Sequence, residues 1–193
     1  MVLQDKKAII FDLDGTLVTS TLAFSTIKEQ IECPPDEDLL LFIAGLSAPF
    51  QKQAAEVVWQ HEWLDAQTSE VLPGVKNFID DANSKGLKMG VVTRNSRLCA
   101  EEKIRRSGLD IGPIIAREDA PPKPHPSGLL YLSEQWQIAP SDIAMIGDYH
   151  YDLTAAKRAG MSAGLYDPES NSPFADQADF RFGCYHELRQ LCL

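Results

Sequence analysis

The chain has 193 residues, of which 44% are hydrophobic and 24% are charged, so it can bury the core of one domain plus an insertion. Its 18 basic and 28 acidic side chains give a net charge of -10, which repels a phosphate backbone and disfavours nucleic-acid binding. No apolar run approaches the roughly 18 residues that a membrane-spanning helix needs, so no membrane association is expected.

The amino-terminal segment and the cysteines bear on the cellular compartment. The segment MVLQDKK lacks the apolar stretch of a signal peptide, so secretion is not expected. The four cysteines show neither the spacing of metal ligands nor the density of a disulfide framework. We therefore expect reduced thiols in a cytoplasmic protein. The cysteines are Cys33, Cys99, Cys184 and Cys192.

An apolar, isoleucine-rich segment at residues 7–11 predicts a buried first strand. The chain that follows it, up to about residue 70, is helical in pattern and contains no second strand of this kind. Helices are expected at 22–31, 37–44 and 49–66, separated by Pro34-Pro35 and by the stretch 45–49. On the longest helix, Ala55, Trp59 and Trp63 share one stripe, which either forms the interior of the insertion or faces a substrate.

From residue 75 onward, helical and extended patterns alternate. Val75, Phe78, Ile79 and Ala82 share one helical face, and Gly86 ends that helix. The other expected helices lie at 97–107, about 129–136 and 151–159. The expected strands lie at 87–93, 113–116, 143–146, 163–166 and 180–182, with the last two at an edge of the sheet.

Strands that alternate with helices imply right-handed crossovers and a parallel sheet covered on both faces. The expected fold is therefore α/β: a doubly wound, Rossmann-like parallel sheet with a small all-helical cap inserted after the first strand. Residues 1–18 and 71–193 would form the core. Residues 19–70, called the cap segment below, would form a lid over it.

Carboxylates are concentrated where two of these strands end, and ligands bind at the carboxyl ends of strands in an open parallel sheet. Asp12 and Asp14 follow the first strand, Asp148 follows strand 143–146, and Asp152 stands four residues further on. One carboxylate can attack phosphorus while another, two residues away, protonates the leaving oxygen. Mg²⁺ suits Asp12, Asp148 and the backbone carbonyl of Asp14. Asp152 either supports such a metal site or caps its helix.

Three further polar residues are expected in the same crevice. Thr93 and Arg94 follow strand 87–93, and Lys123 lies in the proline-rich turn before helix 129–136. A hydroxyl group and an ammonium group can both hold phosphoryl oxygens. Thr93, Lys123 and, beside them, Arg94 are the predicted phosphate-binding residues. Asn95 either caps the next helix or reaches a substrate.

Four short motifs occur in order at these strand ends: FDLDGTLV at 11–18, VVTRN at 91–95, KPHP at 123–126 and GDYHYD at 147–152. Together they resemble the haloacid dehalogenase-like hydrolase superfamily, and the resemblance covers nearly the whole chain. It implies that Asp12 is the nucleophile and Asp14 the acid/base. It also implies that Thr93 and Lys123 bind phosphate, and that Asp148 and Asp152 form the magnesium side of the site.

The function that the resemblance implies is a magnesium-dependent phosphatase. It would hydrolyse a small phosphorylated metabolite through a phospho-aspartate on Asp12, in the manner of phosphoglycolate phosphatases and sugar-phosphate phosphatases. The cap segment would close over the substrate and choose the leaving group. We expect a monomer or a weak dimer.

Several alternatives share parts of this pattern. A β-phosphoglucomutase-like phosphomutase has the same core, and a phosphonate-cleaving relative would need a cap lysine, for which only Lys28 and Lys52 are available. A dehalogenase has no aspartate at the position of Asp14. A phosphorylatable receiver module would need a phospho-accepting aspartate at a central strand end and has no place for the insertion. A catalytically dead metabolite sensor would be expected to lack part of the catalytic set, which is complete here.

Overall fold

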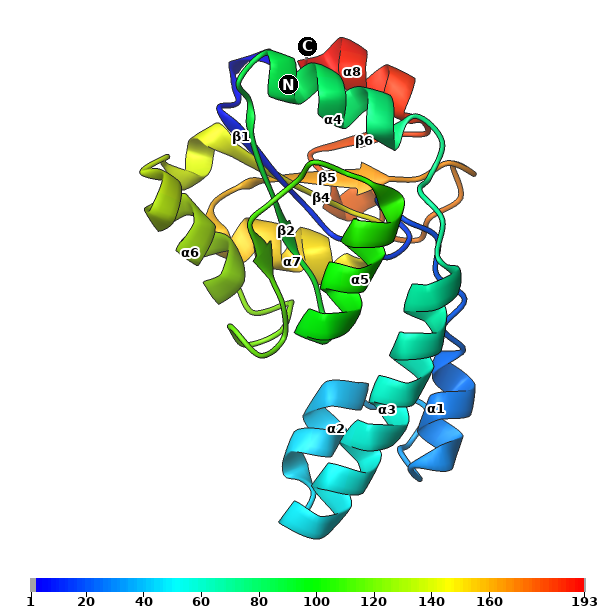
Figure 1. Ribbon diagram of the computed structural model, residues 1–193. Coiled ribbons are helices and arrows are strands. Elements are labelled where there is room, and N and C mark those ends of the chain that lie inside the picture. The colour runs from blue at the N-terminus through cyan, green and yellow to red at the C-terminus, as the bar shows by residue number, and fades with distance from the viewer. Residues whose placement is uncertain (1–2, 193) are drawn as a thin grey trace.

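The computed structural model describes residues 3–192, so the expected core boundaries at residues 1 and 193 lie outside the described residues. Six parallel strands form one sheet in the order β3-β2-β1-β4-β5-β6 (Figure 1). This order confirms the predicted doubly wound, Rossmann-like α/β fold. The strands are β1 (Ala8–Phe11), β2 (Lys88–Val92), β3 (Ile114–Ile115), β4 (Ile143–Gly147), β5 (Ser162–Tyr166) and β6 (Phe180–Phe182).

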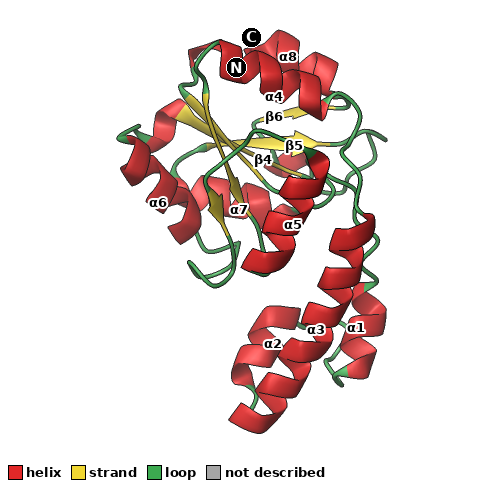
Figure 2. Ribbon diagram, viewed as in Figure 1, coloured by secondary structure: helices red, strands yellow, loops and turns green. Residues whose placement is uncertain are grey.

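Helices cover both faces of the sheet because strand side chains alternate between the faces (Figure 2). On β1, Ile9 and Phe11 join one buried apolar cluster, and Ala8 and Ile10 join the other. The first cluster includes side chains of α4 (Val75–Ser84), α5 (Arg97–Ser107) and α8 (Tyr185–Cys192). The second includes side chains of α6 (Ser127–Trp136) and α7 (His150–Ala159).

The cap segment holds three helices, which lie beyond the carboxyl ends of the strands (Figure 1). They are α1 (Phe24–Gln30), α2 (Leu39–Gly45) and α3 (Ala48–Thr68). Their buried side chains form a third apolar cluster that shares no member with the two clusters on the sheet. The cap segment therefore has its own small interior. None of the helices within residues 3–192 is long and apolar enough to cross a membrane.

Two connecting segments that lie side by side link the cap segment to the rest of the chain. Thr19 N donates to Glu70 O at 2.8 Å, and Glu70 N donates to Thr19 Oγ1 at 2.9 Å. Val18 and Val71 form an antiparallel bridge. These contacts fix the two connections side by side at the base of the helices.

The stripe predicted on α3 was wrong by one position. Ala55 is exposed, and Trp59 and Trp63 are half-buried and stack on each other with ring centroids 5.9 Å apart. The buried side of α3 instead carries two carboxylates, Glu62 and Asp65, among small and apolar residues. Hydrophobic periodicity assigns carboxylates to solvent and so selects the adjacent stripe.

Two smaller differences concern the end of the chain and the short helices. β5 pairs with β4 and β6, so β6 and β3 are the edge strands and β5 is internal. The terminal helix α8 was not among the predicted elements. Three 3-10 turns complete the described chain, at Leu3–Asp5, Pro140–Asp142 and Ala175–Gln177.

Candidate active site

A cavity of about 470 Å³ lies between the carboxyl edge of the sheet and the cap segment. Its floor holds predicted site residues that come from the ends of three neighbouring strands. Asp12 follows β1, Thr93 follows β2 and Asp148 follows β4, because the three strands are parallel and adjacent in the order β2-β1-β4. The remaining predicted residues in its lining are Asp14, Arg94 and Asp152.

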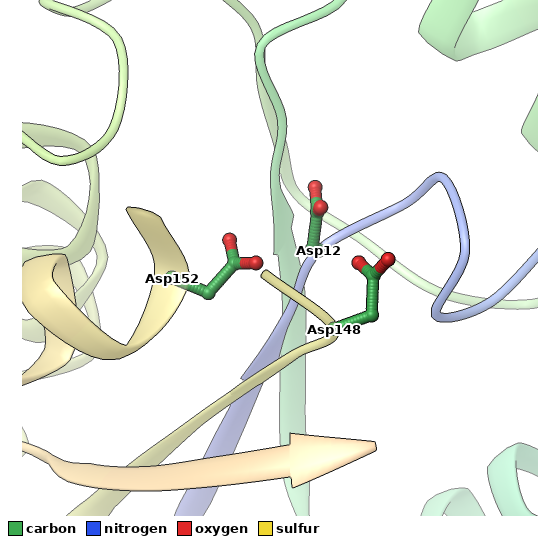
Figure 3. Close-up of side chains that lie close together, drawn as sticks. All are labelled: Asp12, Asp148 and Asp152. Carbon is green, nitrogen blue, oxygen red and sulfur yellow. The ribbon is translucent and has the colours of Figure 1, made fainter. Parts of the chain in front are cut away.

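Three carboxylates converge at this floor. One oxygen each of Asp12, Asp148 and Asp152 lies within 4.8 Å of the others, and Figure 3 shows their side chains turned toward the same space. Gly15 makes room for this arrangement, since its φ is +71° and a Cβ there would lie 2.5 Å from Asp148 Oδ2. Thr16 Oγ1 donates to Asp148 Oδ1 at 3.3 Å.

Lys123 places a buried positive charge against this cluster. Its side chain is 1% exposed, and Nζ lies 2.7 Å from Asp12 Oδ1 and 2.6 Å from Asp152 Oδ1. Burial lowers the pKa of Lys123, but the charges of Asp12 and Asp152 outweigh it and raise the pKa above its usual value. Lys123 therefore stays an ammonium in the site.

The electrostatics of the cluster fit a divalent cation. Burial, followed by the neighbouring charges of Asp12 and Asp152, raises the pKa of Asp148 to about 7. Burial also raises the pKa of Asp152 to about 6, although Lys123 opposes it. Asp152 Oδ1 is buried and lies 2.6 Å from Lys123 Nζ, a cation that it shares with Asp12. Hard oxygen ligands with this much unbalanced negative charge suit Mg²⁺.

Asp152 also organises its own helix. Its second oxygen, Oδ2, accepts a hydrogen bond of 3.1 Å from Tyr149 N at the start of α7. Asp152 thus caps its helix, and because it also belongs to the carboxylate cluster, its support of a metal site remains a prediction.

Magnesium should stabilise the protein more as the pH rises. A carboxyl group whose folded pKa is raised stabilises the fold below its unfolded pKa of 3.8, and that contribution is lost as the pH rises through about 7. The metal-free protein should therefore lose stability across this range. Mg²⁺ at one fixed concentration, a hundredfold above its Kd at about pH 8, should restore about 2.7 kcal/mol at that pH and less at lower pH. Urea unfolding in EDTA and in magnesium, between about pH 5 and about pH 8, measures this gain.

Asp148→Asn is the control for this experiment, because it removes the carboxyl group whose pKa is raised to about 7 and one of the three clustered carboxylates. Its magnesium gain should be small and nearly independent of pH. An equal magnesium gain at every pH in the unmutated protein would contradict the predicted coupling between proton and metal binding.

Asp14 lies beside the cluster but its carboxylate is bound elsewhere. Lys103 Nζ lies 2.5 Å from Asp14 Oδ1, and Asn95 Nδ2 donates to Asp14 Oδ2 at 2.6 Å. Burial raises the pKa of Asp14, and Lys103 and Asn95 only partly oppose it. Asp14 thus holds its proton to a higher pH than an ordinary aspartate, which suits an acid/base group.

Asn95 is not the cap of α5, but it lines the cavity, so contact with a substrate remains a prediction. Ser96 is the N-cap residue of α5, and its side chain makes no capping hydrogen bond. The Asn95 side chain binds Asp14, and its backbone N donates to Thr93 Oγ1 at 3.1 Å. Asn95 therefore joins the predicted phosphate ligand Thr93 to the predicted acid/base residue.

Arg94 lines the cavity, but its guanidinium is already engaged. Nη2 donates to Asp38 Oδ1 at 2.9 Å and Oδ2 at 2.7 Å, and Nη1 donates to the backbone oxygen of Lys123. Cζ lies 4.4 Å from the centre of the Tyr151 ring. The phosphate contact predicted for Arg94 remains a prediction, since this geometry directs its charge to a residue of the cap segment.

Three carboxylates of the cap segment each pair with a cation of the core. Asp38 pairs with Arg94, Glu62 with Arg117, and Asp65 with Lys103. Asp65 Oδ1 also accepts a 2.6 Å bond from Thr21 N, at the start of the cap segment. Charged pairs therefore dock the helices on the sheet.

Five of these six docking residues were not predicted from the sequence: Asp38, Glu62, Asp65, Lys103 and Arg117. A signal was present for Lys103, which falls on the buried face of α5 with Cys99, Ala100 and Ile104. A lysine within an apolar stripe indicates a buried partner. No comparable signal marks Asp38, which sits in an acidic stretch and is also an ordinary helix N-cap.

Comparison with known proteins agrees with the fold and with the motifs. Residues 6–160 match the family model for a haloacid dehalogenase-like hydrolase. A haloacid dehalogenase-like hydrolase domain-containing protein of Arabidopsis thaliana is 27% identical, with 96% of this chain and 83% of that protein covered. A phosphoglycolate phosphatase of Mannheimia succiniciproducens is 28% identical, with 96% and 97% covered. A solved hydrolase from Pseudomonas syringae has the same fold, with a TM-score of 0.81, 19% identity and 96% of each chain covered.

Proposed function

Since the chain belongs to the haloacid dehalogenase-like hydrolase family, we propose that it is a magnesium-dependent phosphatase that cleaves small phosphate monoesters through a phospho-aspartate on Asp12. The observation that carries this proposal is the position of Asp12. Its carboxylate lies on the floor of a cavity between two further carboxylates and a buried ammonium. That combination can both attack a phosphoryl group and balance its charge.

In the first step, an Asp12 oxygen attacks phosphorus. An aspartyl O–P bond forms as the P–O bond to the leaving group breaks, and Asp14 gives its proton to the leaving alkoxide oxygen. In the second step, Asp14 takes a proton from water, which attacks phosphorus and breaks the aspartyl O–P bond. Inorganic phosphate leaves, and Asp12 and Asp14 return to their starting states.

The raised pKa of Asp14 supports its role in the first step, because the carboxyl must carry a proton when the substrate binds. Lys103 and Asn95 hold both of its oxygens, so the carboxyl is also fixed in direction. A fixed donor near the leaving oxygen contributes to catalysis through orientation.

Thr93 and Lys123 would hold the phosphoryl oxygens. Mg²⁺ would be held by Asp12, Asp148, Asp152 and the backbone carbonyl of Asp14, and it would supply positive charge to neutralise the phosphoryl group. The side chain of Asp14 is bound to Lys103 and Asn95, which leaves its backbone oxygen as the proposed ligand.

We further propose that residues 19–70 act as a cap that covers the substrate, with the core formed by 1–18 and 71–193. The cap segment supplies Leu22, Phe24, Leu39 and Leu40 to the cavity wall, so it contacts the leaving group and excludes water. A cytoplasmic location accords with four free cysteine thiols. A monomer or weak dimer remains the proposed state.

Phosphate release from a panel of monoesters tests the proposal. Phenyl phosphate, a set of sugar phosphates and 2-phosphoglycolate would be incubated with the protein in Mg²⁺ or in EDTA. We expect release from at least one ester in magnesium and loss of that release in EDTA. A folded protein that releases no phosphate from any ester in magnesium would contradict the phosphatase assignment.

A further inference from the structure

The wall of the cavity away from Asp12 shows what kind of leaving group it can accept. Most of this wall is apolar or aromatic, with side chains from the cap segment and from the N-cap and first turn of α7. These residues are Leu22, Phe24, Leu39, Leu40, Val58, Tyr149 and Tyr151. A volume of about 470 Å³ is enough for an aromatic ring or a short chain beside a phosphoryl group.

Acidic side chains outnumber basic side chains in this wall. Among the described residues 3–192, the wall contains two cations, Lys28 and Arg94, and three carboxylates, Glu37, Asp38 and Glu62. Lys28 Nζ donates to the backbone oxygens of Pro35 at 2.7 Å and Glu37 at 2.6 Å. Asp38 pairs with Arg94 and Glu62 pairs with Arg117, so a second anionic group on a substrate would find the Arg94 charge already balanced by a carboxylate.

Arg94 is the cation best suited to bind a substrate carboxylate, and Asp38 already occupies it. Both oxygens of Asp38 accept from Arg94 Nη2, so the chain's own carboxylate takes the place that a ligand carboxylate would take. Tyr151 also interacts with Asp38, and burial together with this carboxylate raises the pKa of Tyr151 to about 12. Burial alone would raise the pKa of Asp38, but Arg94, Leu41 N and Tyr151 hold that pKa below its usual value.

We propose that Asp38 is a specificity-determining residue that masks Arg94, so that the cavity selects phosphate esters of neutral apolar or aromatic alcohols over esters that carry a second anionic group. This inference rests on the proposed phosphatase function and narrows its substrate class. A substrate carboxylate would have to displace Asp38 from Arg94 before it could bind there, and the displaced Asp38 would remain beside it as a like charge.

Matched ester pairs test the proposal. Phenyl phosphate is compared with 4-carboxyphenyl phosphate, and ethyl phosphate with 2-phosphoglycolate, by kcat/KM in magnesium. The unmutated protein should prefer the neutral member of each pair. Asp38→Asn should raise the ratio of carboxylated to neutral kcat/KM by about tenfold, since it frees a bidentate guanidinium. Comparing this ratio between variants cancels the different intrinsic reactivity of the esters.

The substitution is conservative for the fold. Asp38 Oδ1 accepts from Leu40 N at 3.0 Å and Leu41 N at 3.1 Å at the start of α2, and asparagine is an equally good N-cap. Asp36→Asn is the matched control, because Asp36 is exposed, does not line the cavity and changes the net charge equally. Its ratio should equal that of the unmutated protein.

Two further variants distinguish the contribution of Arg94 from that of Lys28. Asp38→Asn combined with Arg94→Met should return the ratio to its original value, because the freed guanidinium is then gone. Lys28→Met should leave the ratio unchanged. A large fall in carboxylated turnover in Lys28→Met would assign the second anionic group to Lys28 and overturn the role of Asp38.

Other outcomes also decide the question. If the unmutated protein prefers the carboxylated esters, or if Asp38→Asn and Asp36→Asn shift the ratio equally, the inference is wrong while the phosphatase function stands. If no ester is hydrolysed by the folded protein, the proposed function fails and this inference fails with it.

Discussion

Replacing Asp12 with asparagine should lower kcat for phosphate-ester hydrolysis by about ten-thousand-fold or more. The amide cannot form the aspartyl O–P bond, and the change also removes one of three carboxylates whose oxygens lie within 4.8 Å of one another. The fold should remain intact, since Lys123 keeps its second partner, Asp152, at 2.6 Å. Steady-state hydrolysis of phenyl phosphate in magnesium measures the loss, and thermal unfolding checks the fold.

Asp110→Asn is the matched control for this experiment. It makes the same chemical change at an exposed position outside the cavity, and its kcat should equal that of the unmutated protein. Retention of a tenth of the activity in Asp12→Asn would show that another group is the nucleophile and would remove the phospho-aspartate from the mechanism.

Replacing Lys103 with methionine should lower the free energy of unfolding by about 3–5 kcal/mol. The Lys103 side chain is 0% exposed and pairs with Asp14 at 2.5 Å and with Asp65 at 2.7 Å. Methionine fills a similar volume but leaves two carboxylates without their cation. The effect on kcat should be larger for alkyl than for aryl esters, because poor leaving groups depend more on a well-directed Asp14.

Lys76→Met provides the comparison for Lys103→Met in urea unfolding. Lys76 pairs with Asp80 on the exposed side of α4, where both side chains are more than half exposed. Removing this pair should cost less than about 1 kcal/mol. Equal losses in the two variants would mean that the buried network contributes no more than a surface ion pair.

The regular part of the molecule could be predicted because its signals are local. Most strands of the sheet are short apolar runs. The predicted core helices repeat apolar residues on one face, as Val75, Phe78, Ile79 and Ala82 do on α4. The cavity floor follows from the same signals, since parallel strands bring the residues after them to one edge. Asp12, Thr93 and Asp148 lie at that edge as expected.

The contacts between the cap segment and the core could not be predicted in this way. Asp38 and Arg94 are 56 positions apart, and Asp65 and Lys103 are 38 apart, so no periodicity connects them. The sequence also gave no reason to place Glu62 and Asp65 on the buried stripe of α3. Carboxylates are buried there because cations of the core face them, and that depends on how the helices sit on the sheet.

The separation of the apolar clusters has a consequence for solubility during turnover. The apolar cluster inside the cap segment shares no member with the two clusters on the sheet. Moving the cap helices away from the sheet would therefore hydrate the ion pairs between cap segment and core, and the apolar clusters would stay buried. The apolar surface that an opened molecule exposes would be that of the cavity wall, while the separate interiors would stay covered, which limits the risk of aggregation. Added salt would screen the separated charges and shift the balance toward the opened form.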